Sequence, residues 1–141
     1  DLDFTGRRIL LAEDNAINTE VAVLLLQAKG FIVDTAETGE QALRCYEASS
    51  PYSYDAILMD IRMPVMDGLS AAAAIRRCPR ADAAQIPIVA MTANAFDDDI
   101  AKSLAAGMNA HLAKPIDPDL LYQTLNDLIG NKEENPWRTL K

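Results

Sequence analysis

The chain has 141 residues and a formal net charge of −8, and 50% of its residues are hydrophobic and 24% charged. This length suits one domain with a sizeable core and is too short for two ordinary domains, and the composition is that of a globular protein. The acidic balance argues against a nucleic-acid surface, which needs clustered Lys and Arg, and no apolar run approaches the roughly 18 residues of a membrane span.

Short apolar runs alternate along the chain with longer segments whose apolar residues recur at helical spacing. The predicted strands are 8–12, 31–36, 56–59, 86–91 and 110–113. The predicted helices are 16–29, a second helix opened by a capping box at 38–41, and then 69–77, 96–106 and 118–129. Before and after this region we expect a linker over residues 1–6 and a polar linker or tail over residues 131–141, with the folded domain over residues 7–130.

The first predicted helix has apolar residues at a spacing that lines one face. The residues expected to face the core are Ile17, Val21, Leu24, Leu25 and Ala28. Val23 and Leu26 are then left for the outer face, where we expect a partner to dock.

Alternation of five strands with five helices predicts βαβ units, a parallel sheet and right-handed crossovers. The strands are short apolar runs rather than strict alternations of apolar and polar residues, as expected when helices cover both faces of the sheet. The fold class is therefore α/β, doubly wound, in three layers.

Polar side chains stand at the ends of four predicted strands. Strand one ends in Glu13 and Asp14, strand three in Asp60, strand four in Thr92 and strand five in Lys114. Because the carboxyl ends of parallel strands open on the same edge of a sheet, all five side chains are expected in one small region. Each residue alone could be a capped loop or a surface ion pair, but five together at one edge indicate a site.

Three carboxylates repel one another in a low-dielectric pocket, and a hard divalent cation with oxygen ligands removes the repulsion. We therefore predict Mg²⁺, with Mn²⁺ able to replace it. Such a pocket supports phosphoryl transfer to a carboxylate, with Asp60 as the nucleophile. Lys114 would pair with a phosphoryl oxygen as a point charge, and the Thr92 hydroxyl could donate a hydrogen bond to another.

With these residues in place, the chain resembles the response regulator receiver domains of two-component signalling over about Arg8 to Gly130. The motifs that carry the resemblance are Leu-Ala-Glu-Asp-Asn (11–15), Leu-Met-Asp-Ile-Arg-Met-Pro (58–64), Met-Asp-Gly (66–68), Ala-Met-Thr-Ala-Asn (90–94) and Ala-Lys-Pro (113–115). Each motif is weak by itself, whereas all five in order at strand ends are highly specific.

The resemblance implies a flavodoxin-like receiver fold with strand order 2-1-3-4-5, and Asp60 as the phosphoacceptor. It implies Asp14 as a direct metal ligand, Glu13 as a ligand through water and the backbone carbonyl of Arg62 as a further ligand. A receiver of this kind catalyses its own Mg²⁺-dependent phosphorylation and dephosphorylation.

The resemblance also implies Thr92 as the switch hydroxyl, Lys114 as the phosphate-binding lysine and a cis bond between Lys114 and Pro115. Receivers commonly carry Tyr or Phe three residues before the lysine, where this chain has His111. Histidine is smaller and more polar than Tyr or Phe, which argues against the aromatic switch in this chain. His111 either keeps a switch role or fills a partly exposed position on the last strand. Arg62 and Asn94 flank the pocket and are expected to tune phosphate lifetime.

Within the family, the chain is most similar to receivers fused to hybrid sensor histidine kinases, on the runs 13–18 and 106–116 and on its start without methionine. The phosphoryl donor would then be a phosphohistidine of the kinase, and the onward acceptor a histidine of a phosphotransfer domain. The domain would be cytoplasmic, as two cysteines without a disulfide framework also suggest, and its parent could be anchored in the cell membrane. The domain itself is expected to contact neither nucleic acid nor membrane.

Four alternatives are open. A stand-alone response regulator would carry the same motifs. A phosphatase of the haloacid-dehalogenase type needs a second aspartate two residues after the nucleophile, where this chain has Arg62. A pseudo-receiver that only docks would have lost Asp60, the acidic pair or Lys114, and this chain keeps all of them. A flavodoxin-like cofactor binder would carry a Gly-rich or Ser/Thr-rich phosphate loop after strand one, and this chain has none there.

Overall fold

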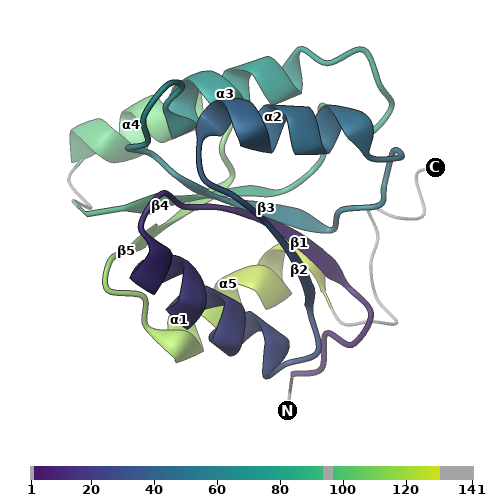
Figure 1. Ribbon diagram of the computed structural model, residues 1–141, viewed down its shortest axis with the longest axis vertical. Coiled ribbons are helices and arrows are strands. Elements are labelled where there is room, and N and C mark those ends of the chain that lie inside the picture. The colour runs from purple at the N-terminus through teal and green to yellow at the C-terminus, as the bar shows by residue number, and fades with distance from the viewer. Residues whose placement is uncertain (1, 94–96, 131–141) are drawn as a thin grey trace.

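The computed structural model describes residues 2–93 and 97–130, which form a five-stranded sheet between two helical layers (Figure 1). The strands are β1 (Arg8–Ala12), β2 (Ile32–Ala36), β3 (Ala56–Asp60), β4 (Ile88–Thr92) and β5 (Ala110–Ala113). The helices are α1 (Ala16–Gln27), α2 (Gly39–Ala48), α3 (Gly68–Arg76), α4 (Asp97–Ala105) and α5 (Pro118–Ile129). All neighbouring strands pair in parallel in the order β2-β1-β3-β4-β5, so the predicted fold class and strand order are confirmed.

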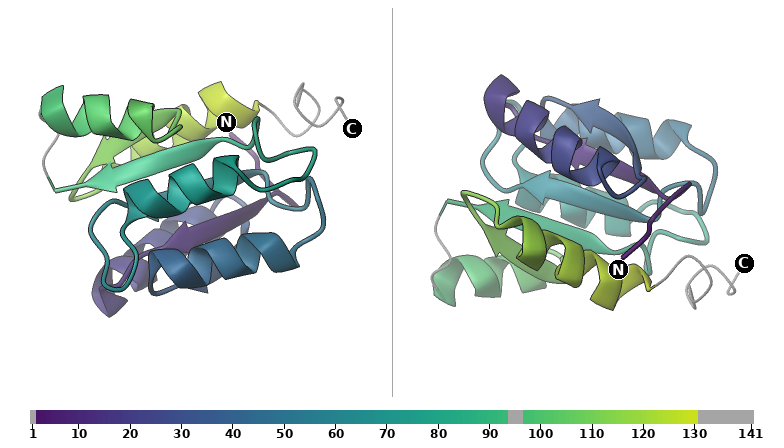
Figure 2. Two further views of the ribbon diagram at one scale, coloured as in Figure 1. Left: turned by 90° about the horizontal axis from the view of Figure 1, so that it is seen from above. Right: turned by 90° about the horizontal axis from the view of Figure 1, so that it is seen from below.

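Helices α1 and α5 cover one face of the sheet, and α2, α3 and α4 cover the other (Figures 1 and 2). Successive residues of a strand point to opposite faces, so each central strand supplies both cores. Leu10 and Ile57 pack in the core under α2 and α3, whereas their neighbours Leu11 and Leu58 pack in the core under α1 and α5. Every residue of β3 is buried, which explains why the strand is a continuous apolar run.

Side-chain caps begin most helices at the predicted places. The Thr38 hydroxyl accepts a hydrogen bond from the Gln41 amide at 3.0 Å, and Asp67 and Asp117 cap α3 and α5 in the same way. The bounds of β1, β5 and α5 agree with the prediction, and the other elements shift by one or two residues. β4 begins only after Pro87, because proline has no amide hydrogen for the sheet.

The predicted core face of α1 is wrong for most of its residues. Ile17 and Leu24 are 71% and 62% exposed and Val21 is also exposed, whereas Leu25 packs partly buried against the core. The residues that the helix buries fully are Ala22 and Leu26. Apolar residues occur on almost every side of this helix. A stripe through Ala22 and Leu26 therefore satisfies helical spacing as well as the predicted stripe that includes Val21 and Leu24. The docking face predicted at Val23 and Leu26 is therefore wrong as well. Leu26 lies in the core, and Val23 packs against that core.

The N-terminal segment packs on the domain. Phe4 is fully buried and stacks on Phe31 with ring centroids 4.6 Å apart. The Arg7 guanidinium donates a hydrogen bond to the carbonyl of Ile129 at the end of α5. Phe4, which falls in the segment expected as a linker, thus packs with the folded domain. The tail expected over residues 131–141 lies outside the described residues. Among the helices of the described ranges, none combines the length and apolar character needed to cross a bilayer.

Candidate functional site

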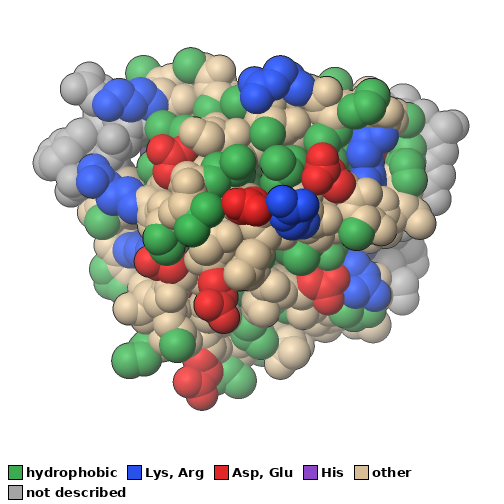
Figure 3. All heavy atoms as spheres, turned by 45° about the horizontal axis from the view of Figure 1, so that its top comes forward, with side chains coloured by type: hydrophobic (Ala, Val, Ile, Leu, Met, Phe, Trp, Pro, Cys, Tyr) green, Lys and Arg blue, Asp and Glu red, His purple; other side chains and the backbone are tan. Residues whose placement is uncertain are grey.

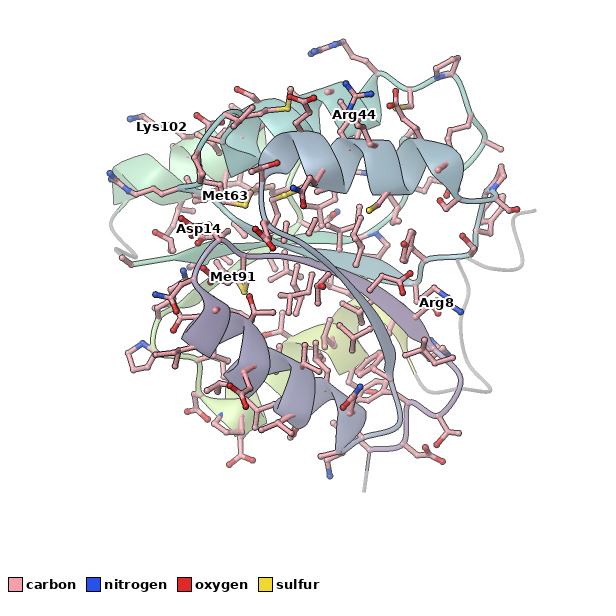
Figure 4. All side chains as sticks on the ribbon, in the orientation of Figure 1. Arg8, Asp14, Arg44, Met63, Met91 and Lys102 are labelled. Carbon is pink, nitrogen blue, oxygen red and sulfur yellow. The ribbon has the colours of Figure 1, made fainter. Side chains whose placement is uncertain are left out.

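The polar strand ends meet at one edge of the sheet. Figure 4 shows Asp14 at this edge and Arg8 at the opposite end of β1. Asp60 pairs in register with Met91 and Thr92 with Ala113, so the ends of β3, β4 and β5 are level. The structure thus confirms that the strand pattern gathers Glu13, Asp14, Asp60, Thr92 and Lys114 in one region.

Lys114 bridges two buried carboxylates. Its ammonium Nζ lies 2.7 Å from Oδ2 of Asp60 and 2.8 Å from Oε1 of Glu13. Burial of the ammonium works to lower the pKa of Lys114, but its hydrogen bonds with Asp60 and Glu13 outweigh burial and raise that pKa above its usual value. Lys114 is therefore a fixed positive charge beside the carboxylate that is the predicted nucleophile.

The three acidic residues fit a hard cation. One carboxylate oxygen from each of Glu13, Asp14 and Asp60 lies within 4.8 Å of the other two, with Glu13 and Asp60 buried and Asp14 exposed. All three donors are oxygens, and one side of the cluster opens to solvent, as an ion that keeps several waters requires. The donor set therefore matches Mg²⁺ by its chemistry.

The loop after β3 closes the site on a second side. The Arg62 amide donates a hydrogen bond to Oδ1 of Asp60 at 3.3 Å, and the Ile61 amide donates to the carbonyl of Met91 at 3.0 Å. The Arg62 side chain is exposed and lines an open cleft together with Asp14 and Lys102. This arrangement keeps the Arg62 backbone beside the acidic cluster.

Two features of this loop were not predicted from the sequence. Val65 has a φ of 69°, at the centre of a tight turn in which the Met66 amide donates to the carbonyl of Pro64 at 2.8 Å. The Gly39 amide at the start of α2 donates to the carbonyl of Met66 at 3.0 Å. The sequence offered one signal for the contact between Gly39 and Met66. Gly39 is the first residue of a helix, although Ala forms helix better than Gly.

The remaining predicted residues are distributed around the lysine. Thr92 is buried at the end of β4, and its carbonyl accepts a hydrogen bond from the Lys114 amide at 2.8 Å. The Lys114–Pro115 peptide bond is cis, as the resemblance implied. His111 lies half-buried on β5, beside Ala90 of β4. Asn94 lies outside the described residues.

An apolar pocket lies next to the acidic cluster, between α1 and the connection from β5 to α5. Its lining includes Val21, Met91, Pro115 and Ile116, together with Glu13 and Lys114. On the α2, α3 and α4 side of the molecule, acidic and basic side chains lie interspersed rather than in blocks of one sign (Figure 3). The apolar pocket lies on the α1 side of the sheet, since Val21 and Ala22 of α1 belong to its lining.

Sheet order and the charged cluster at the carboxyl ends of the strands define a doubly wound α/β domain of the flavodoxin-like kind. Residues 9–126 match the response regulator receiver domain family, and the chain belongs to that family. It is thus a receiver domain of two-component signalling, which sets aside the phosphatase and cofactor-binding alternatives.

Relatives with the same domain include sensor kinases. The chain is 42% identical over 125 residues to hybrid signal transduction histidine kinase I of Dictyostelium discoideum, covering 87% of this chain and 7% of that protein. It is 42% identical to the receiver domain of sensor histidine kinase PA1611 from Pseudomonas aeruginosa, whose crystal structure has a magnesium ion in the active site cleft. That match has a TM-score of 0.81 and covers 90% of this chain and 100% of the other.

A third relative was crystallised with its partner. The receiver domain of Ssk1 from Saccharomyces cerevisiae, in complex with the histidine phosphotransfer protein Ypd1, is 27% identical with a TM-score of 0.78. The match covers 89% of this chain and 90% of that chain.

Proposed function

We propose that this domain accepts a phosphoryl group from a phosphohistidine onto Asp60 and relays it within a phosphorelay. The observation that carries the proposal is the position of Asp60 at the end of β3, held between the Lys114 ammonium and the Arg62 amide beside two further carboxylates. The Lys114 ammonium and the Arg62 amide each contact a different oxygen of the Asp60 carboxylate and so fix its position at the site.

The transfer itself exchanges one bond to phosphorus for another. A carboxylate oxygen of Asp60 attacks phosphorus as the bond from phosphorus to the imidazole nitrogen breaks, and the departing imidazole takes a proton from solvent. Lys114 then pairs with an oxygen of the new acyl phosphate, and the Thr92 hydroxyl donates to another. Hydrolysis or transfer to a second histidine returns Asp60 to its carboxylate.

Glu13, Asp14 and Asp60 would hold Mg²⁺, together with the backbone carbonyl of Arg62. When bound, the cation neutralises charge on the phosphoryl oxygens. Support comes from the close set of carboxylate oxygens and from the magnesium ion in the Pseudomonas relative. Mn²⁺ should replace Mg²⁺, because it accepts the same oxygen ligands.

The proposed partners are the phosphohistidine domain of a kinase and a histidine phosphotransfer domain. The exposed Ile17, Val21 and Leu24 of α1 offer an apolar surface beside the pocket at Pro115, next to Asp60 and Lys114. Apolar patches of this kind mark protein-binding sites, and the yeast relative binds a phosphotransfer protein. We further propose that the parent is a hybrid histidine kinase and that the domain is cytoplasmic; Cys45 and Cys78 are both free thiols, in line with a reducing compartment.

Residues around the phosphate would set how long it persists. Arg62 is exposed at the rim of the cleft, where it can contact a phosphoryl group or the water that removes it, and Asn94 is proposed to flank the site from the β4 side. His111 takes the place of the usual aromatic switch residue, with Pro115 holding the turn after Lys114.

The test is the intact mass of the protein after incubation with acetyl phosphate. Wild type should gain one phosphoryl group with Mg²⁺, gain none with EDTA, and lose the group with hydroxylamine. Asp60→Asn should gain none, while Asp67→Asn, a change in the same loop that keeps a capping residue, should behave as wild type. A folded wild type that gains no phosphoryl group under any of these conditions would establish a docking pseudo-receiver instead.

A further inference from the structure

Helix α2 begins directly against the loop that follows Asp60. The Gly39 amide, the first of the helix, donates a hydrogen bond to the carbonyl of Met66 at 3.0 Å. The first amides of a helix have no partner within the helix, so this donor is available to hold a neighbouring segment. Here the neighbouring segment is the loop of residues 61–67, which joins Asp60 to α3.

Only glycine fits at this contact. A Cβ atom on residue 39 would overlap the carbonyl oxygen of Met66 and would lie 2.8 Å from the carbonyl oxygen of Asp67. Both obstructing atoms belong to backbone, so no side chain can rotate away to make room. Residue 39 has no left-handed φ, which means that the need for glycine is one of space and not of backbone conformation.

The loop is held equally tightly on its other side. A Cβ atom on Gly68 would overlap the carbonyl oxygen of Asp60, and the Gly68 amide donates to the carbonyl of Ile61 at 2.8 Å. Between the two glycines, Pro64 has a fixed φ and Val65 already occupies the centre of a tight turn with positive φ. A push on Met66 would therefore be transmitted along the loop toward Arg62 instead of being absorbed.

We infer that Gly39 is a positioning residue for the metal site: its contact with Met66 holds the 61–67 loop where the Arg62 backbone lies beside the acidic cluster. The inference rests on the proposed function, because it takes the Arg62 carbonyl as a metal ligand. Residues that orient the ligands of a metal typically change its affinity about 10- to 100-fold when they are replaced.

Helix propensity alone predicts a different outcome. Ala is a better helix former than Gly, so Gly39→Ala would strengthen α2 and leave the Mg²⁺ affinity unchanged if the residue served only the helix. The steric argument predicts weaker Mg²⁺ binding, so the Mg²⁺ dissociation constant separates the two explanations.

The test compares two variants at the start of the same helix. Gly39→Ala adds the obstructing Cβ, whereas Thr38→Ala removes the cap and weakens α2 without pushing on the loop. Mg²⁺ affinity is measured by isothermal titration calorimetry on protein shown to be folded by circular dichroism. We expect the dissociation constant of Gly39→Ala to rise about tenfold or more, and that of Thr38→Ala to stay within about twofold of wild type. Equal affinities of Gly39→Ala and wild type, or equal losses in both variants, would overturn the inference.

A measurement on wild type covers the case in which Gly39→Ala does not fold. Titration with Mg²⁺ should shift the backbone amide resonance of Gly39 together with that of Arg62 in ¹⁵N–¹H spectra. If Arg62 shifts and Gly39 does not, the proposed function stands and the positioning role is wrong. If the wild type binds no Mg²⁺, the proposed function itself fails, and the inference fails with it.

Discussion

The Lys114 ammonium and the Asp60 carboxylate lie 2.7 Å apart across 54 positions of sequence, and they join the ends of β5 and β3. Glu13 shares the same ammonium, so one lysine forms ion pairs with two buried carboxylates at the site. A phosphoryl group on Asp60 would give Lys114 a new anionic partner, which makes this lysine the link between phosphorylation and the β5 edge of the sheet.

Lys114→Met should destabilise the domain when no divalent cation is present. The change leaves Glu13 and Asp60 buried without their counter-charge, which typically costs about 3–5 kcal/mol. Added Mg²⁺ should restore more stability to the variant than it gives to wild type, because the cation then supplies the missing charge. Urea unfolding in EDTA and in Mg²⁺ measures both effects.

The matched control for this change is Lys102→Met. Lys102 lines the same cleft but is exposed on α4, so its loss should change stability by less than about 0.5 kcal/mol. Equal stabilities of Lys114→Met and wild type in EDTA would show that the buried carboxylates do not need the lysine.

Leu24→Asp and Leu26→Asp should have opposite consequences. Leu24 is exposed on the apolar surface of α1, so Leu24→Asp should leave the fold intact and slow phosphotransfer from a histidine phosphotransfer protein. Leu26 is fully buried, and placing a carboxylate there should prevent folding. Circular dichroism and a phosphotransfer time course separate the two; unchanged transfer by Leu24→Asp would place the partner elsewhere.

The sequence predicted the site better than it predicted the surfaces. Strand ends are marked by a change from apolar to polar residues, and parallel pairing then brings Asp60, Thr92 and Lys114 together without any side-chain detail. The buried face of α1 could not be predicted, because two apolar stripes satisfy the same spacing and only packing against the sheet chooses Leu26. The Gly39–Met66 contact depends on how two distant segments approach, which no local pattern records.

Val65→Gly should stabilise the domain. Val65 is 80% exposed, so little packing is lost, and its positive φ is strained for a β-branched side chain. Relief of that strain stabilises the folded state, while the greater freedom of glycine in the unfolded chain offsets part of the gain. The free energy of unfolding should rise by about 1 kcal/mol in total. Urea unfolding measures this change, with Val65→Ala, which keeps a Cβ atom at the positive φ, as the control. A loss of stability would mean that the turn is not strained.

Phe4→Ala should destabilise the domain by about 3–5 kcal/mol, as for other buried phenylalanines. The side chain is fully buried against Phe31 although it precedes the first strand, so removal of residues 1–6 should have a similar effect. Asp3→Ala, a change in the same segment that leaves Phe4 in place, should cost less. Thermal unfolding compares wild type with the two substituted proteins and with the protein that lacks residues 1–6. Unchanged stability after removal of residues 1–6 would support the predicted domain boundary at residue 7.

A buried aspartate lies in the connection between α3 and β4. Asp82 is fully buried, accepts hydrogen bonds from the Tyr46 hydroxyl at 2.9 Å and the Tyr52 amide at 3.0 Å, and pairs with Arg80 at 2.8 Å. Burial works to raise the pKa of Asp82, but the hydrogen bonds from Arg80, Tyr52 and Tyr46 outweigh it and bring that pKa below its usual value.

Asp82 should therefore make the stability of the domain depend on pH in the acid range. The pKa of Asp82 is lower in the folded than in the unfolded state, so the unfolded chain binds the proton first as pH falls. The stability that Asp82 contributes is therefore fully present above about pH 4 and is lost as pH falls below that value. Asp82→Asn removes the charge, so it should be less stable than wild type at pH 7, by about 3 kcal/mol, with a gap that narrows toward pH 3. Urea unfolding of both proteins across this pH range gives the difference between their free energies of unfolding. The other carboxylates contribute equally to both proteins, so their contributions cancel in that difference. Asp127→Asn, on the exposed side of α5, serves as the surface control and should change stability at pH 7 by less than about 0.5 kcal/mol. A gap between wild type and Asp82→Asn that stays constant with pH would show that the network needs the shape of the aspartate and not its charge.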